Sequence, residues 1–332
     1  MSKKKIGLVG YFGWGNFGDE LFVETHKQYL GKKYTLEIVN DILAEPYFSK
    51  PVSKIAQDYD AFLIGGGDLI NPIRVSKLYW QMDFLQKPVF IYGIGVPNVK
   101  WSRENVLNHY RKFFNHENCK LIVARDIESF NWLKDNFDIE DKLQWYPDAV
   151  CSYNKPPKIE TKDKILGVVI RGHRSFEKDS LVHLRKMIEE AKEKGYKIKH
   201  LILANKQLGQ ADLEQTKELA IEGEDIFYSE SLEEMCREIS KCSLLASIKF
   251  HGMIVATMYG IPTIALSVTP KNRNFLRMLE QPQMLESYNQ PLLYQRVPYY
   301  PSPIHSLVRG SLYRRSKAGY LYLMEKMEET IK

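Results

Sequence analysis

Short apolar runs of strand-like composition alternate with stretches of helical spacing, and this alternation constrains the fold more than any other feature of the chain. In the first half the runs are KIGLVGYF, YTLEIVND, YDAFLIGGGD, KPVFIYGIGVP and CKLIVARD. Residues 21–30 and 128–137 show the apolar spacing of helices between such runs. Buried strands that alternate with helices are typical of a parallel sheet covered on both faces.

A polar, proline-containing segment, NKPPKIETKDK at residues 154–164, is predicted to be a linker. A second alternation follows it, with the runs ILGVVIRGH, IKHLILANK, DIFYSE, LLASIKFHG and IPTIALSV. Helices are predicted at 181–194, 212–221 and 231–241, and the last begins with a capping box formed by Ser231 and Glu234. A final helix is predicted at 319–331, after a stretch rich in Tyr and Pro.

These patterns predict an α/β fold of two Rossmann-like domains with parallel sheets. The N-terminal domain is expected at residues 1–155, the C-terminal domain at 164–280, and a C-terminal extension with the terminal helix at 281–332. The length of 332 residues agrees with two domains, since a domain usually has ~100–200 residues.

Charge and cysteine content narrow the class of protein. The 47 Lys and Arg against 41 Asp and Glu give a net charge of +6, which favours anionic ligands but lacks the basic imbalance typical of nucleic-acid binding. The cysteines are scattered and form no C-x-x-C pair, so we expect buried free thiols in a reducing compartment. They are Cys119, Cys151, Cys236 and Cys242. No apolar run approaches the ~20 residues of a membrane span, and we expect a cytoplasmic protein.

Three glycines, Gly13, Gly15 and Gly18, match the G-x-G-x-x-G spacing of a dinucleotide-binding turn between a strand and a helix. Such a turn offers bare backbone amides and the positive end of the helix dipole to a pyrophosphate. Asp19 and Glu20 place two carboxylates there instead. We therefore favour a glycine-rich turn that lets another chain segment or a sugar approach the backbone over a nicotinamide or flavin site.

A second glycine cluster, Gly65, Gly66 and Gly67, ends the predicted strand YDAFLI. Its backbone can adopt positive φ and admit a ligand at the carboxyl edge of the sheet, where open α/β sheets bind ligands. A tight turn without a ligand explains the same pattern. The next residue, Asp68, is a candidate base or hydrogen-bond acceptor for a hydroxylated substrate, with a helix cap as the alternative.

Four basic residues in the second half follow predicted strands or begin predicted helices: Arg171, Lys249, His251 and Lys271. The guanidinium of Arg171 suits a carboxylate or a phosphate. Lys249 and His251 are expected on one side of an extended segment, and Lys271 in the first turn of a helix. Each alone is typical of a solvated surface charge, but four at equivalent edges of one sheet favour an anion site.

Several of these segments together resemble those of polysaccharide pyruvyl transferases. GYFGWGNFGDE, the GGG turn after YDAFLI, YGIGVP, ARDIESFNWL, PDAV and SIKFHGMIVATMYGIPTIALSVTPKNRNFL occur in the order and at the rough spacing of that family, over about residues 6–280. The resemblance implies a GT-B-like glycosyltransferase architecture. It also implies transfer of a pyruvyl group from phosphoenolpyruvate to two hydroxyls of a polysaccharide or its lipid-linked precursor, as a ketal. No cofactor and no metal are expected.

The resemblance also suggests roles for individual residues. The Arg-Leu-His motif of the family falls on Lys249, Phe250 and His251, and its Asp-Pro-Lys motif on Thr269, Pro270 and Lys271. We expect Arg171, Lys249 and Lys271 to bind the donor, and Gly15 and Asn16 in the first motif to contact substrate. His251 is the candidate acid or base, because histidine ordinarily titrates near neutrality, and a phosphate ligand is its alternative role.

Lysine in place of the family's arginine keeps the charge but loses the bidentate fork, which puts the donor more than the fold in question. Two other functions therefore stay open, a nucleotide-sugar glycosyltransferase of the same fold and a non-catalytic member.

A basic run at 302–317 contains Arg309, Arg314, Arg315 and Lys317. It is either a solvated face or a peripheral contact with an anionic membrane, with Leu307, Leu312 and Tyr313 dipping into the interface.

We expect phosphoenolpyruvate to raise the thermal midpoint of the protein and NAD and FAD to leave it unchanged. The reason is that a ligand stabilises only the state that binds it, and the Asp19 and Glu20 carboxylates occupy the position that a pyrophosphate needs. Thermal unfolding with each compound in turn measures this. A clear upward shift with either dinucleotide would contradict our interpretation of the first glycine motif.

Overall fold

The structure, a computed structural model, describes residues 3–44, 46–97, 101–172, 181–220, 222–297 and 304–331. The chain forms two compact units. Unit 1 contains Met1–Gly13, Leu21–Tyr153 and Leu312–Lys332, and unit 2 contains Trp14–Glu20 and Asn154–Ser311. Residues 221 and 298–303, which belong to a predicted helix end and to the Tyr- and Pro-rich stretch, lie outside the described residues.

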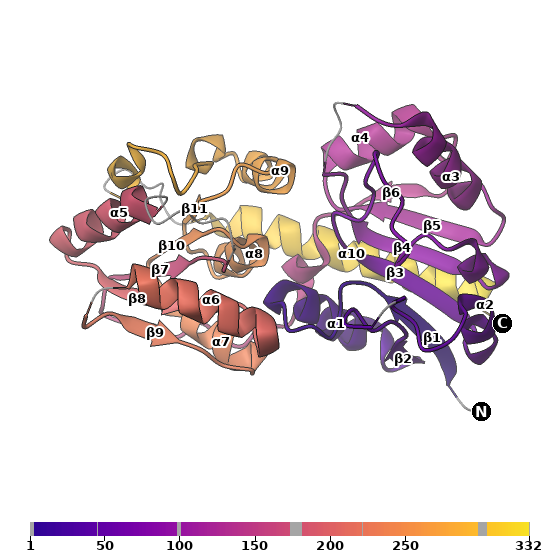
Figure 1. Ribbon diagram of the computed structural model, residues 1–332, viewed down its shortest axis with the longest axis horizontal. Coiled ribbons are helices and arrows are strands. Elements are labelled where there is room, and N and C mark those ends of the chain that lie inside the picture. Colours follow the sequence, from indigo (N-terminus) through magenta and orange to yellow (C-terminus); the bar gives the residue numbers. More distant parts are fainter. Residues whose placement is uncertain are drawn as a thin grey trace. The chain divides into compact units, whose positions relative to one another are not determined.

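Unit 1 is built on a six-stranded parallel sheet in the order β2-β1-β3-β4-β5-β6, with helices on both faces (Figure 1). The strands are β1 (Lys4–Val9), β2 (Tyr34–Ile38), β3 (Ala61–Gly67), β4 (Val89–Ile94), β5 (Cys119–Ala124) and β6 (Leu143–Trp145). The helices are α1 (Phe17–Leu30), α2 (Val52–Ile55), α3 (Glu104–Phe114), α4 (Ile127–Asn136) and α10 (Ser306–Thr330), with short 3-10 turns η1 (Ala56–Asp58), η2 (Met82–Gln86) and η3 (Ala149–Ser152). The first turns of α1 and α10 are grouped with unit 2.

Unit 2 is built on a five-stranded parallel sheet in the order β11-β10-β7-β8-β9. The strands are β7 (Ile165–Val169), β8 (Lys197–Leu201), β9 (Asp225–Phe227), β10 (Leu244–Ser247) and β11 (Thr263–Ala265). The helices are α5 (Val182–Glu193), α6 (Lys206–Leu219), α7 (Leu232–Ser240), α8 (Phe250–Met258) and α9 (Pro270–Met278), followed by the 3-10 turns η5 (Pro282–Met284) and η6 (Leu293–Arg296). The prediction of two Rossmann-like parallel α/β sheets is confirmed.

The central strands of unit 1, β3, β4 and β5, bury both of their faces, which explains their continuous apolar sequences. Because successive side chains of a strand alternate between the faces, Phe62 and Ile64 of β3 and Ile91 of β4 point to one side. There they join the cluster made with α2, η2, α3 and α4. Tyr92 of β4 points to the other side, toward α1 and α10.

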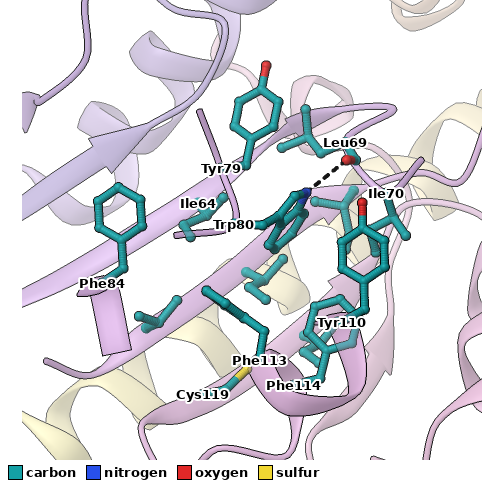
Figure 2. Packing of buried hydrophobic residues seen from close by; sticks show 14 of the residues in the cluster. Ile64, Leu69, Ile70, Tyr79, Trp80, Phe84, Tyr110, Phe113, Phe114 and Cys119 are labelled. Atoms are coloured by element: carbon teal, nitrogen blue, oxygen red, sulfur yellow. Dashed lines mark hydrogen bonds between the residues drawn. The ribbon is translucent and has the colours of Figure 1, made fainter. Parts of the chain in front are cut away.

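Trp80 lies at the centre of the first cluster and fixes the loop that follows β3 (Figure 2). It is 1% exposed, and aromatic rings of α3 contact it edge-on at centroid separations of 5.4 to 5.7 Å. Its indole nitrogen donates to the carbonyl of Leu69, 3.1 Å away. Since Leu69 follows Asp68, the core holds the end of the glycine cluster in place.

The opposite face of the sheet in unit 1 buries a histidine. His26 of α1 is 0% exposed, and its Nδ1 lies 2.9 Å from the hydroxyl of Tyr320 in α10. Phe12, Phe22 and Tyr92 contact the imidazole edge-on. Burial lowers the pKa of His26 from 6.5 to about 3, so the ring is neutral in the folded protein.

Most predicted helices are present, with differences that have local causes. The helix expected at 212–221 begins earlier, at Lys206, and the helix expected at 319–331 is the second half of the longer α10. The capping box at Ser231 is half formed, because its hydroxyl accepts the amide of Glu234 but the Glu234 carboxylate turns to the hydroxyl of Ser229. The segment at 154–164 has no regular structure, as a linker requires, and the four cysteines are free and buried, as predicted.

Acidification should destabilise unit 1 through His26. A histidine whose pKa is depressed in the folded state contributes stability above its unfolded pKa, here 6.5, and loses about 1.4 kcal/mol for each pH unit below it until the folded pKa is reached. We expect urea unfolding between about pH 6.5 and pH 4 to show a shallower loss of stability in His26→Phe than in the wild type. The matched control is His116→Phe, at a partly exposed site. Equal slopes in all three proteins would contradict the assignment.

Candidate functional site

Three strands that are neighbours in unit 2 bring the predicted basic residues to one edge. The order β11-β10-β7 places β10 between the other two, and all three strands are parallel. Arg171 follows β7, Lys249 follows β10, and Lys271 follows β11. The sheet order thus gathers residues that are up to 100 positions apart in the sequence at the carboxyl edge, where ligands bind open α/β sheets.

His251 is not on an extended segment beside Lys249, and that expectation was wrong. β10 ends at Ser247, and α8 begins at Phe250, so Lys249 is the residue that caps the helix and His251 lies in its first turn. The buried ring of Phe250 contacts the imidazole at a centroid separation of 5.2 Å. His251 therefore stands at the positive end of the α8 dipole.

The segment Trp14–Glu20, which carries Gly15 and Gly18 of the first glycine motif, belongs to unit 2 and packs against the same edge. Asn16 forms an antiparallel bridge with Ala204, and the carbonyl of Gly15 accepts the amide of Asn205 at 2.7 Å. A Cβ on Gly18 would lie 1.8 Å from Nδ1 of His251. The glycine at this position is therefore what lets the imidazole approach the backbone.

The turn satisfies its own amides. The amide of Gly15 donates to the Glu20 carboxylate at 3.1 Å, and the amide of Gly18 to the side-chain oxygen of Asn16 at 3.2 Å. Gly15 has φ +86°, and a Cβ there would lie 2.7 Å from the carbonyl oxygen of Asn205. Both a positive φ and a close backbone approach therefore require glycine at this position.

Lys271 lies in the first turn of α9, as predicted. The hydroxyl of Thr269 caps this helix by accepting the amide of Asn272. The Lys271 ammonium is 5.9 Å from the centre of the Phe250 ring, the ring that also contacts His251. The first turns of α8 and α9 thus bring Lys271 and His251 to the same aromatic side chain.

Lys249 is buried in an ion pair with Asp212 of α6, with 14% of its side chain exposed. Burial lowers the pKa of its ammonium, and the Asp212 carboxylate opposes that shift. Sequence reasoning missed Asp212. The sequence offered one signal, the helical spacing of Asp212 with Gly209, Thr216 and Leu219. In the structure these residues form the buried face of α6, where a carboxylate requires a partner.

Unit 1 presents a second polar edge, at the end of β3. Gly66 and Gly67 have φ values of +81° and +115°, and a Cβ on Gly65 would lie 2.1 Å from the carbonyl oxygen of Tyr92. The cluster thus needs glycine for its conformation and for its contact with β4. Asp68, directly after it, is ion-paired with Arg125, which follows β5.

The guanidinium of Arg125 is 2% exposed and lies between carboxylates. Besides Asp68, Asp148 has an oxygen 3.8 Å away. Burial acts to lower the pKa of Arg125, but the charges of Asp68, Asp148 and Asp126 outweigh it and raise that pKa. Sequence reasoning assigned no role to Arg125 or Asp148, although ARDIESFNWL and PDAV, which contain them, are family-like segments.

Comparison with known proteins identifies the family. A model of the family "Polysaccharide pyruvyl transferase" matches residues 16–270, most of the chain. The chain belongs to the polysaccharide pyruvyl transferase family. The match includes the turn at Asn16 and the starts of α8 and α9, at Phe250 and Pro270, which border the edge described in unit 2. A search of curated protein sequences found no match.

Solved structures show which fold this family member adopts. A Listeria monocytogenes protein described as a UDP-N-acetylglucosamine 2-epimerase has a TM-score of 0.61 at 11% identity, covering 99% of this chain and 97% of that one. The Methanocaldococcus jannaschii UDP-GlcNAc 2-epimerase in complex with UDP-GlcNAc and UDP has a TM-score of 0.56 at 11% identity, covering 96% and 99%. The glycotransferase of kitacinnamycin has a TM-score of 0.50 at 9% identity, covering 99% of each. These similarities show a GT-B-like fold.

The basic run near the C-terminus of this family member lies at the start of α10. Leu312 is 5% exposed, so the expectation that it dips into a membrane interface was wrong, whereas Leu307 is 71% exposed. Arg315 stacks on Trp145 at 4.1 Å, and Arg309 donates to the carbonyl of Ile304 at 3.0 Å. Among the described helices, none combines the length and the apolar composition needed to cross a bilayer. Membrane contact stays a prediction.

Replacing Gly18 by alanine should displace His251. The added methyl group would meet the imidazole at 1.8 Å, and overpacking of this kind costs about 1–3 kcal/mol of folding free energy. In a His251→Ala background the clash is absent, so Gly18→Ala should then cost little. Urea unfolding of the two single variants and the double variant measures this coupling. Equal costs of Gly18→Ala in both backgrounds would contradict the packing of His251 on Gly18.

Proposed function

We propose that this chain transfers the pyruvyl group of phosphoenolpyruvate to two hydroxyls of a saccharide and forms a pyruvate ketal. Family membership supports the reaction class. The observation that carries the choice of donor is the convergence of Arg171, His251 and Lys271 at the ends of neighbouring strands. Phosphoenolpyruvate has a phosphate and a carboxylate, and cations beside helix N-termini suit both groups.

The reaction defines what these residues must do. Two hydroxyl oxygens bond to C2 of phosphoenolpyruvate, the bond from C2 to the phosphate oxygen breaks, one hydroxyl proton reaches the methylene carbon, and the other leaves with the phosphate. Arg171 and Lys271 would hold the anionic groups and stabilise the departing phosphate. His251, in the first turn of α8, would move a proton between the acceptor hydroxyl and the donor. Lys249 adds to the positive field of this edge, offset by Asp212.

The acceptor is proposed to be a saccharide, either free or carried on a lipid. Asp68 would accept a hydrogen bond from an acceptor hydroxyl, because an ion-paired carboxylate is a hydrogen-bond acceptor held in one orientation. Its side chain is 23% exposed, enough for one such contact. We likewise propose that Gly65, Gly66 and Gly67, which precede Asp68 in unit 1, contact substrate through their backbone, and that Gly15 and Asn16 do so in unit 2.

Removing either donor cation should weaken phosphoenolpyruvate binding. A hydrogen bond to a charged group is worth about 1.5–3 kcal/mol, so Arg171→Ala and Lys271→Ala should each raise the Kd about 10- to 100-fold. His251→Ala should instead lower acceptor-dependent phosphate release by a factor of about 10² at saturating donor. Calorimetric titration and a phosphate-release assay with a panel of hexose and N-acetylhexosamine acceptors measure the two effects.

Two substitutions away from this edge serve as controls, Lys217→Ala in the last turn of α6 and Lys194→Ala at the C-terminal end of α5. Neither should change the Kd or the rate. A protein that binds UDP-N-acetylglucosamine but not phosphoenolpyruvate would overturn the proposed donor. Full phosphate release in His251→Ala would overturn the role of that residue.

A further inference from the structure

The side chain of Asp212 connects three segments of unit 2. It is 3% exposed. Its Oδ1 accepts the amide of Gly172 at 2.7 Å, and its Oδ2 is ion-paired with Nζ of Lys249. Both oxygens of a buried carboxylate are thus engaged, one by the loop after β7 and the other by Lys249, the N-cap residue of α8.

The ammonium of Lys249 makes two contacts within the protein. Besides Asp212, it donates to the carbonyl of Leu203 at 2.9 Å. That carbonyl follows β8 and also accepts the amide of Phe17 in the glycine turn, at 3.4 Å. The Lys249–Asp212 pair therefore ties α6 and α8 to the backbone that supports the turn.

The loop after β7 is pressed against α6. A Cβ on Gly172 would lie 2.3 Å from the carbonyl oxygen of Ala211, so this position accepts only glycine without a shift of the backbone. Arg171 is the preceding residue, and its place depends on this contact. The bond from Gly172 to Asp212 thus sets the backbone from which the Arg171 guanidinium extends.

Lys249, the N-cap residue of α8, is held by its backbone as well as by its side chain. The hydroxyl of Ser247 accepts the amide of Lys249 at 3.1 Å and donates to its carbonyl at 2.8 Å. With Nζ paired to Asp212, both the backbone and the side chain of Lys249 are fixed. His251 follows two residues later, so its position on the first turn of α8 depends on this anchor.

We propose that Asp212 is a positioning residue, which aligns Arg171 and His251 by binding Gly172 and Lys249, and that Lys249 serves the site through this pair and does not bind the donor. The roles of Arg171 and His251, the residues that are aligned, rest on the proposed function. The ion pair between Asp212 and Lys249 does not depend on it. Removing one member of such a pair leaves an uncompensated charge, whereas removing both does not.

The test compares Asp212→Asn, Lys249→Met and the double variant. Asparagine keeps an oxygen for the Gly172 amide and loses the charge that holds Lys249. We expect each single variant to lower the turnover number about tenfold or more at saturating phosphoenolpyruvate, and to leave the Kd of phosphoenolpyruvate within about threefold. The double variant should be no worse than the worse single variant, because the two residues act as one unit. Glu214→Gln and Lys217→Met, at exposed positions of α6, are the matched controls.

Donor affinity decides between positioning and direct binding. If Lys249 bound the donor, Lys249→Met would raise the Kd of phosphoenolpyruvate tenfold or more, and Asp212→Asn would lower it by freeing a cation. That pair of results would overturn the proposal. If a single variant fails to fold, the double variant should still fold, since it contains no unpaired charge.

Urea unfolding without any ligand tests the pair independently of the reaction. We expect the unfolding midpoint of the double variant to lie above the value obtained by adding the two single shifts. Additive shifts would overturn the pair itself. A wild type that neither binds nor turns over phosphoenolpyruvate would contradict the proposed function, and the coupling in the unfolding midpoints would still decide whether Asp212 and Lys249 act together.

Discussion

An ion pair with at least one enclosed member lies at the carboxyl edge of each sheet, and the candidate site residues of both units adjoin these pairs. Parallel strands buried on both faces leave little room for polar groups except where the strands end. In unit 1 the pair is Arg125 with Asp68, and in unit 2 it is Lys249 with Asp212. A charge enclosed in this way must stay with its partner, because an unpaired one would cost several kcal/mol. The edge loops are therefore held by electrostatics as well as by packing.

The pairs also divide the charged residues into two kinds. Members that are almost fully enclosed, such as Arg125 and Asp212, hold the edge loops, while Asp68, with 23% of its side chain exposed, can also contact the proposed acceptor. Arg171 is exposed, and Lys271 lies at the start of α9 beside Phe250. A donor with a phosphate and a carboxylate would therefore meet these two cations and the dipoles of α8 and α9. In the turn from Trp14 to Glu20, the amides of Gly15 and Gly18 donate to Glu20 and Asn16. The turn therefore contributes a backbone that other segments can approach closely, and it contributes little positive charge.

The sequence predicted the two sheets, the linker and most helices, because buried strands are continuous apolar runs and half-buried helices have apolar residues at helical spacing. It also predicted that Arg171, Lys249 and Lys271 follow strands of one sheet. It did not predict the pairing of Lys249 with Asp212 or of Arg125 with Asp68, since the partners are 37 and 57 positions apart and no local pattern connects them. The prediction that His251 lies on an extended segment was wrong for a local reason. β10 has only four residues, and α8 begins after two more, before His251 is reached.

Unit 1 is assembled from separate stretches of chain, and its stretch Leu312–Lys332 follows all of unit 2 in the sequence. The hydrogen bond between His26 and Tyr320 joins residues 294 positions apart, and the hydroxyl of Ser316 reaches back to the carbonyl of Asp148. A nascent chain translated through Ser311 holds every residue of unit 2 and still lacks Leu312–Lys332. Vectorial synthesis thus reverses the order of completion: the unit that begins first lacks its stretch Leu312–Lys332 until all of unit 2 has been synthesised, and the rings that Tyr320 contacts stay uncovered until that stretch has emerged.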